Sequence, residues 1–120
     1  MKILIVDDSP LIIKRLGEFL SDLGHQVIIA YDGKESMVAY NQELPDLVFM
    51  DILMPGPDGI SVMRSIISKH AKARIIIMSS MGQQSKVIGA IQYGAIDFIV
   101  KPFEPSKILL ALEKATNTLS

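Results

Sequence analysis

Short apolar runs alternate along the chain with longer stretches in which apolar residues recur at helical spacing. The apolar runs are rich in β-branched residues and show little alternation with polar ones. Such runs are typical of strands that are buried on both faces of a sheet. Five strands are predicted on this basis, at Ile3–Val6, Val27–Ala30, Leu47–Met50, Ile75–Met78 and Phe98–Val100.

Each predicted strand is followed by a stretch with the i, i+3, i+4 periodicity of an amphipathic helix. In the first stretch Ser9 is a suitable N-cap, Pro10 fits the first turn, and Gly24 can end the helix in a left-handed conformation. The other helices are expected to begin near Gly33, Gly59, Gln84 and Pro105. The side chains expected to face the core are, in chain order, Ile12, Leu16, Phe19, Leu20, Leu23, Met37, Tyr40, Met63, Ile66, Ile67, Val87, Ile88, Ile91, Ile108, Leu109 and Leu112.

Five strands that alternate with five helices predict an α/β fold. Strands separated by helices are joined by right-handed crossovers, which give a parallel sheet with helices on both faces. Five such units suit a flavodoxin-like (βα)5 sheet of strand order 2-1-3-4-5. The chain contains no linker, repeat or low-complexity segment, so we expect residues 1–120 to form one domain.

Composition narrows the functional classes. Twelve basic and thirteen acidic residues give a formal net charge of −1, so no overall field favours nucleic acid or an anionic membrane. The absence of cysteine excludes disulfides, thiolate metal sites and cysteine nucleophiles. The first apolar run is too short for a secretory signal, and no stretch approaches the roughly 20 apolar residues that cross a membrane. We therefore expect a cytoplasmic protein that binds neither nucleic acid nor membrane.

Four of the five predicted strands end in side chains that can do chemistry. Asp7 and Asp8 follow the first strand, Asp51 the third, Ser79 the fourth and Lys101 the fifth. In an open α/β sheet, ligands bind beyond the carboxyl ends of the strands, where the strand order reverses beside the first strand. The sequence therefore predicts three carboxylates, a hydroxyl group and an ammonium group in one pocket.

Three carboxylates in one pocket repel one another. Two of them about 5 Å apart repel by roughly 3 kcal/mol at an effective dielectric constant near 20. Either one takes a proton or a cation lies between them. Oxygen ligands without a nearby histidine or cysteine favour Mg²⁺, with Mn²⁺ as the alternative. We therefore predict that Asp7 and Asp8 hold a divalent cation, whereas a helix-start role for the two acids is the simpler alternative.

A metal, a further carboxylate, a hydroxyl group and a lysine suit phosphoryl transfer, which depends on positioning and charge neutralisation. In this interpretation Asp51 is the nucleophile and becomes an aspartyl phosphate. The metal bridges Asp51 to the incoming phosphoryl group, while Lys101 and Ser79 contact two of its other oxygens.

Four segments together resemble the receiver domain of CheY-type response regulators of two-component signalling, namely VDDSP, MDILMPGPDG, IIIMSSMG and DFIVKPF. They occur in the order and spacing of the family, and the resemblance spans the whole chain. It implies that Asp51 is the phosphoacceptor and that Asp8 and Asp51 bind the metal directly. It also implies that the backbone carbonyl of Leu53 is a third metal ligand and that Asp7 acts through a metal-bound water.

The resemblance also implies which residues sense the phosphoryl group. Ser79 and Lys101 would bind it, and the Lys101–Pro102 peptide bond is cis in the family. Phe98 occupies the position of the family's switch aromatic, with a role in the core alone as the alternative. In the family, phosphorylation draws the hydroxyl group at the position of Ser79 toward the phosphate and the aromatic ring turns. The surface of the fourth helix, fifth strand and fifth helix then changes and binds a target protein.

Some positions depart from the family's commonest residues. Leu53 and Met81 stand at positions that tune the loss of phosphate, and both are apolar. We expect them to shield the acyl phosphate from water and to give a moderately long-lived phosphoryl group. Gly56-Pro57 replaces a frequent X-Met pair, and acceptor chemistry is expected to survive this change.

The resemblance implies a phosphohistidine on a sensor histidine kinase as the phosphoryl donor. Because the chain ends soon after the fifth predicted helix, we expect no output domain. We expect a switch that promotes only its own phosphorylation and dephosphorylation, and not an enzyme. The segment from Ser79 to Phe103 is similar to chemotaxis-type receivers, whose target is the flagellar motor switch.

Four alternatives remain. The chain could be a phosphorelay intermediate or a receiver fragment of a larger regulator. A Mg²⁺-dependent phosphohydrolase would place its two acids two residues apart after the first strand and carry a cap, whereas Asp7 and Asp8 are adjacent. A flavodoxin-like electron carrier would need a phosphate cradle after that strand, where this chain has two acids.

Overall fold

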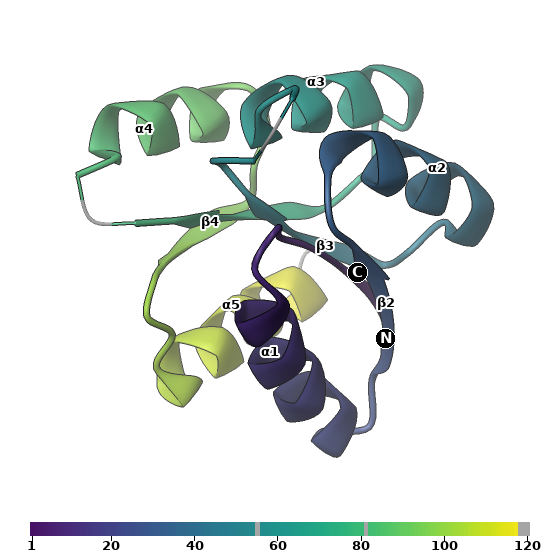
Figure 1. Cartoon of the computed structure of the whole chain (residues 1–120), viewed down its shortest axis with the longest axis vertical. Coiled ribbons are helices and arrows are strands. Elements are labelled where there is room, and N and C mark those ends of the chain that lie inside the picture. The colour runs from purple at the N-terminus through teal and green to yellow at the C-terminus, as the bar shows by residue number, and fades with distance from the viewer. Residues whose placement is uncertain (55, 81, 118–120) are drawn as a thin grey trace.

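Strands and helices alternate in the computed structural model, which describes residues 1–54, 56–80 and 82–117 (Figure 1). The strands are β1 (Lys2–Val6), β2 (Gln26–Ala30), β3 (Leu47–Asp51), β4 (Ile75–Ser79) and β5 (Asp97–Val100). The helices are α1 (Pro10–Asp22), α2 (Gly33–Glu43), α3 (Gly59–Lys69), α4 (Gln84–Gln92) and α5 (Pro105–Asn117). Each of these strands is one residue longer than predicted, and each helix begins where it was predicted.

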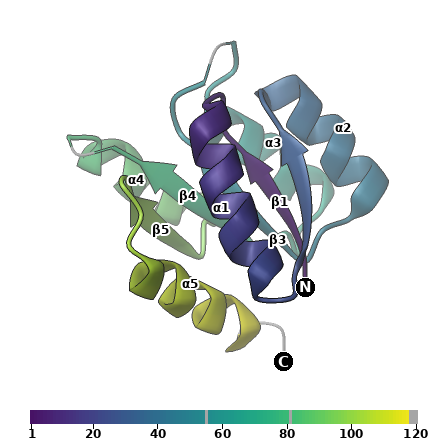
Figure 2. The same ribbon diagram turned by 60° about the horizontal axis from the view of Figure 1, so that its bottom comes forward.

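The strands form one parallel sheet of order β2-β1-β3-β4-β5. Helices α1 and α5 cover one face of the sheet, and α2, α3 and α4 cover the other (Figures 1 and 2). The predicted flavodoxin-like architecture is therefore confirmed. The register pairs Val6 with Met50 and Ser79 with Val100, so neighbouring strands end at similar heights. The residues that follow them emerge at one edge of the sheet.

Side-chain caps fix where three of the helices begin. Ser9 Oγ accepts a hydrogen bond from the backbone N–H of Ile12 at 3.4 Å. Asp32 and Asp58 accept bonds of 2.8 Å from the N–H groups three residues further on, at the starts of α2 and α3. These oxygens satisfy backbone donors that have no partner within the helix. Because Ser9 caps α1, the helix begins directly after Asp7 and Asp8.

Two apolar clusters pack against the two faces of the sheet. Leu4, Val48 and Ile77 belong to the cluster under α2, α3 and α4, and Ile5 and Phe49 to the cluster under α1 and α5. The apolar residues of β1, β3 and β4 are buried on both faces, as predicted. The edge strands differ from the prediction, because they expose part of their apolar residues. An edge strand has a neighbouring strand on one side only, so its burial is incomplete.

Some predicted core positions are wrong. Four side chains expected to face the core are 42 to 60% exposed, namely Leu23, Ile88, Ile91 and Leu109. Helix α4 instead turns Val87 and Ala90 to the sheet, and α5 turns Ile108 and Ala111. Alanine allows a helix to approach the sheet closely, and larger residues then lie at its flanks. No helix in the described ranges is long and apolar enough to cross a membrane.

Candidate functional site

Three acidic residues meet beyond the carboxyl ends of β1 and β3. One carboxylate oxygen from each of Asp7, Asp8 and Asp51 lies within 4.8 Å of the other two. Asp7 is fully buried and Asp51 is 5% exposed, whereas Asp8 is exposed. This acidic cluster is therefore closed beneath Asp7 and Asp51 and open to solvent on the side of Asp8.

Lys101 reaches the acidic cluster from the segment that follows β5. Its Nζ lies 2.7 Å from Oδ2 of Asp7 and 3.3 Å from Oδ1 of Asp51. The peptide bond between Lys101 and Pro102 is cis. The other oxygen of Asp7, Oδ1, accepts a hydrogen bond of 2.9 Å from the backbone N–H of Ser9. Both oxygens of this buried carboxylate thus have partners, which the burial of a charge requires.

Burial and charge in the cluster shift two pKa values. Burial, followed by the charge of Asp7, raises the pKa of Asp51 to about 6. The charge of Lys101 and hydrogen bonds from Lys101 and the backbone of Leu53 oppose this rise. Burial by itself would lower the pKa of Lys101, but its contacts with Asp7 and Asp51 outweigh burial and raise it. Near neutral pH the lysine is therefore charged, and Asp51 is ionised but close to its titration range.

The donors of the acidic cluster fit a hard divalent cation. They are oxygens only, and three carboxylates carry more negative charge than one lysine neutralises. The backbone of Leu53 lies beside them, because it donates a hydrogen bond to Asp51. The fold thus gathers in one neighbourhood the three residues that we predict as direct metal ligands and Asp7, which we predict to act through a metal-bound water.

Ser79 lies at the same carboxyl end of the sheet as the acidic cluster. It is the last residue of β4, which pairs with the strand that carries Asp51, and it is 1% exposed. Its carbonyl oxygen accepts a hydrogen bond of 2.7 Å from the backbone N–H of Lys101. The end of β4 therefore lies between the strand that carries Asp51 and the segment that carries Lys101, and contact of the Ser79 hydroxyl group with a phosphoryl group stays a prediction.

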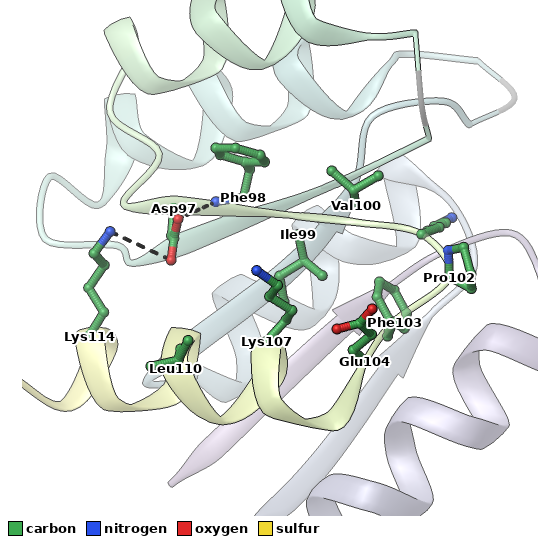
Figure 3. A pocket seen from close by; sticks show the side chains of 11 residues that line it. Asp97, Phe98, Ile99, Val100, Pro102, Phe103, Glu104, Lys107, Leu110 and Lys114 are labelled. Atoms are coloured by element: carbon green, nitrogen blue, oxygen red, sulfur yellow. Dashed lines mark hydrogen bonds and ion pairs between the residues drawn. The ribbon is translucent and has the colours of Figure 1, made fainter.

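Phe98 lies on the edge strand β5 and is 45% exposed. Its ring stands on the side of β5 that faces away from α5 (Figure 3). It lines an apolar groove between β5 and α4 with Ile88, Ile91 and Val100. Ser79 lines the same groove, so the groove extends from the predicted switch aromatic to the end of β4.

Sequence reasoning missed two features near this site. Ile88 and Ile91, which are predicted to face the core, instead form the exposed apolar wall of the groove. Gln83 was assigned no role, yet its Oε1 accepts a hydrogen bond of 2.7 Å from the backbone N–H of Ser80. The available signal was a glutamine at an N-cap position, where Ser, Thr, Asp or Asn is usual. The predicted role of Met81 lies outside the described residues.

Comparisons with known proteins agree with this arrangement. A family model described as the response regulator receiver domain matches residues 3–113. The chemotaxis protein CheY of Bacillus subtilis (strain 168) is 46% identical over 117 residues, which cover 97% of this chain and 98% of that protein. The probable transcriptional regulator ycf27 of Guillardia theta is 40% identical over 107 residues, which cover 89% of this chain and 42% of that protein.

A solved structure shows the same fold. The receiver domain of NtrX from Brucella abortus superposes with a TM-score of 0.93 at 35% sequence identity, and the match covers 98% of this chain and 99% of that one. In a structure of a longer NtrX chain, the present chain spans 27% of the length. Relatives of similar length and longer regulators thus share this fold.

Proposed function

The chain belongs to the response regulator receiver domain family, and on that premise we propose that it is a stand-alone, chemotaxis-type regulator of two-component signalling. Similarity to B. subtilis CheY over nearly the whole of that protein supports this role. The match to ycf27 extends over less than half of that regulator. We further propose that residues 1–120 act as one receiver domain, and that the protein works in the cytoplasm.

Phosphoryl transfer to Asp51 is the central chemical step of the proposal. The donor is a phosphohistidine of a sensor histidine kinase. An oxygen of the Asp51 carboxylate bonds to phosphorus as the bond from phosphorus to the histidine nitrogen breaks. The ammonium group of Lys101 pairs with one phosphoryl oxygen, and the hydroxyl group of Ser79 donates to another. The observation that carries the proposal is the meeting of Asp51, two further carboxylates and Lys101 at one edge of the sheet.

Divalent cation binding is part of the proposal. Asp8, Asp51 and the backbone carbonyl of Leu53 would hold Mg²⁺ directly, and Asp7 would act through a water. When bound, Mg²⁺ neutralises charge that otherwise opposes the approach of a phosphoryl group to three carboxylates. The exposure of Asp8 supports this assignment, because it leaves one side of the acidic cluster open to a hydrated ion.

The output surface is proposed to comprise α4, β5 and α5. Phe98 would turn in the groove beside α4 when Ser79 moves toward the phosphoryl group, which shifts the population between two packings. The same surface continues past β5 to α5, where Leu110 is exposed between Lys107 and Lys114 (Figure 3). Exposed apolar side chains with polar or charged neighbours suit a protein partner, which we propose to be the flagellar motor switch.

One experiment tests the core of this function. The protein is incubated with acetyl phosphate and Mg²⁺, and its mass is measured for a phosphoryl adduct. We expect an adduct in the wild-type protein, and none in Asp51→Ala or in excess EDTA. Absence of an adduct from the wild-type protein, or its persistence in Asp51→Ala, would contradict the proposal. Steady turnover of a generic phosphate ester would instead favour a phosphohydrolase.

A further inference from the structure

The peptide group between Ser79 and Ser80 is held from both sides. Its carbonyl oxygen, which belongs to Ser79, accepts a hydrogen bond of 2.7 Å from the backbone N–H of Lys101. Its N–H, which belongs to Ser80, donates a hydrogen bond of 2.7 Å to Oε1 of Gln83. One partner comes from the segment after β5 and the other from the residue before α4. This peptide group therefore connects both segments to the end of β4.

Gln83 makes this contact in place of a helix cap. It is the N-cap residue of α4, but its side chain makes no capping hydrogen bond to that helix. In α1, α2 and α3 the N-cap side chain does accept a bond from the first turn. The side chain of Gln83 thus fixes the end of β4 and leaves the N-terminus of α4 without a side-chain cap.

We propose that Gln83 is a positioning residue that holds Ser79 in its resting arrangement and opposes its movement toward a phosphoryl group on Asp51. This inference rests on the proposed function, in which the hydroxyl group of Ser79 donates to that group. Ser79 is almost fully buried, and close packing restricts rotation of its side chain, so we expect displacement of its hydroxyl group to move the adjoining peptide group as well. The side of this peptide group toward Lys101 is held by a backbone hydrogen bond that continues the pairing of β4 with β5, whereas the other side is held by one side chain. The movement is therefore taken up at the hydrogen bond to Gln83.

Loss of the Gln83 contact should favour the phosphorylated arrangement. A contact made in only one of two states shifts their ratio by its own free energy. For a single hydrogen bond this is a factor of roughly two to ten. A variant without the contact should then bind a phosphoryl analogue more tightly than the wild-type protein. A variant that merely disordered the connection to α4 would bind it less tightly, so the direction of the change separates the two roles.

The test compares the wild-type protein, Gln83→Ala and Gln84→Ala. Gln84 is the exposed neighbouring glutamine, so its variant is a matched control. Each protein is titrated calorimetrically with beryllium trifluoride anion at saturating Mg²⁺. We expect roughly two- to tenfold tighter binding by Gln83→Ala and wild-type affinity for Gln84→Ala. Without metal, the amide hydrogen of Ser80 should exchange faster in Gln83→Ala and at the wild-type rate in Gln84→Ala.

The outcomes separate this inference from the proposed function. Equal or weaker analogue binding by Gln83→Ala, or an unchanged exchange rate at Ser80, overturns the positioning role. The proposed function still stands after such a result if the wild-type protein forms a phosphoryl adduct at Asp51 with acetyl phosphate as the donor. If the wild-type protein neither forms the adduct nor binds the analogue, the proposed function fails and the positioning role fails with it.

Discussion

The ammonium group of Lys101 lies 2.7 Å from a carboxylate oxygen of Asp7, although 94 positions separate the two residues in the sequence. This ion pair joins the segment after the edge strand β5 to the segment after the interior strand β1. Because Lys101 also lies 3.3 Å from Asp51, one cation offsets charge on two acids of the cluster in the resting protein. A divalent ion and a phosphoryl group must both rearrange this pairing.

Removal of the Lys101 ammonium group is expected to strengthen Mg²⁺ binding while it weakens signalling. Lys101→Ala leaves three carboxylates without their internal cation, so Mg²⁺ affinity should rise by about tenfold, or ~1.4 kcal/mol. The variant should still accept phosphate from acetyl phosphate but bind a target poorly. Calorimetry with Mg²⁺ measures the affinity, and Lys69→Ala, on the last turn of α3, is the control. Unchanged or weaker Mg²⁺ binding by Lys101→Ala would contradict this account of the pair.

Replacement of Asp51 by asparagine should stabilise the metal-free protein at neutral pH. The folded-state pKa of Asp51 is about 6, above its ordinary value of 3.8, so the folded state binds its proton more tightly than the unfolded state does. Wild-type stability is therefore lost as pH rises from about 4 to 6, and a neutral side chain avoids this loss. Asp51→Asn should be more stable at pH 7.5 by roughly 1–3 kcal/mol.

The check on this prediction is urea unfolding in EDTA at several pH values. The advantage of Asp51→Asn should shrink toward pH 4, where both proteins carry a neutral side chain at this position. Addition of Mg²⁺ should stabilise the wild-type protein more than the variant. A constant difference across the pH range would point to an origin other than the charge of Asp51.

Substitution of Gly59 should damage both the fold and the acceptor. A Cβ atom at Gly59 would lie 1.9 Å from the backbone oxygen of Asp51 and 2.8 Å from its carbonyl carbon, so the backbone under the acceptor must shift. We expect Gly59→Ala to lose at least ~2 kcal/mol of unfolding free energy and to form the Asp51 adduct slowly. Gly89→Ala is the matched control, because nothing lies within 4 Å of its Cβ position in α4. There the helix should gain up to about 1 kcal/mol.

Truncation of Ile88 should weaken binding of the target protein with little change in the free energy of unfolding. Ile88 is 60% exposed on α4, so Ile88→Ala should change the unfolding free energy by less than about 0.5 kcal/mol. The same change should weaken binding of the phosphorylated protein to its target, because it removes part of the apolar groove. Val38→Ala, at a 50% exposed position on α2, should affect neither property. Retention of full target affinity by Ile88→Ala would place the partner on another surface.

The phosphoryl group on Asp51 is expected to persist for clearly longer than about one second, because apolar side chains limit the access of water. The backbone of Leu53 donates a hydrogen bond to Asp51, and its apolar side chain is 52% exposed, so we expect it to limit the access of water to the acceptor. Loss of the adduct is followed by mass after acetyl phosphate is removed. Leu53→Asn should shorten the lifetime. A wild-type half-life near one second would mean that this shielding is ineffective.

The sequence by itself determined the order of the elements and predicted which charged side chains would meet at one end of the sheet. Apolar runs, helical spacing and residues such as Ser9 are local signals, and each strand and helix followed from them. Parallel strands place their carboxyl ends at one edge of the sheet, so Asp7, Asp51 and Lys101 were expected to meet before their distances were known.

Only the tertiary structure decided which side chains are exposed and which distant residues contact one another, because both depend on neighbours from other elements. Periodicity predicted an apolar face on α4 but not which of its residues contact the sheet. Ala90 packs against the sheet, and Ile88 is therefore exposed at the side of the helix. The pairing of Lys101 with Asp7 and the contact of Gln83 with Ser80 depend on positions fixed to within an ångström. Such positions result from the packing of whole elements, which no local stretch of sequence specifies.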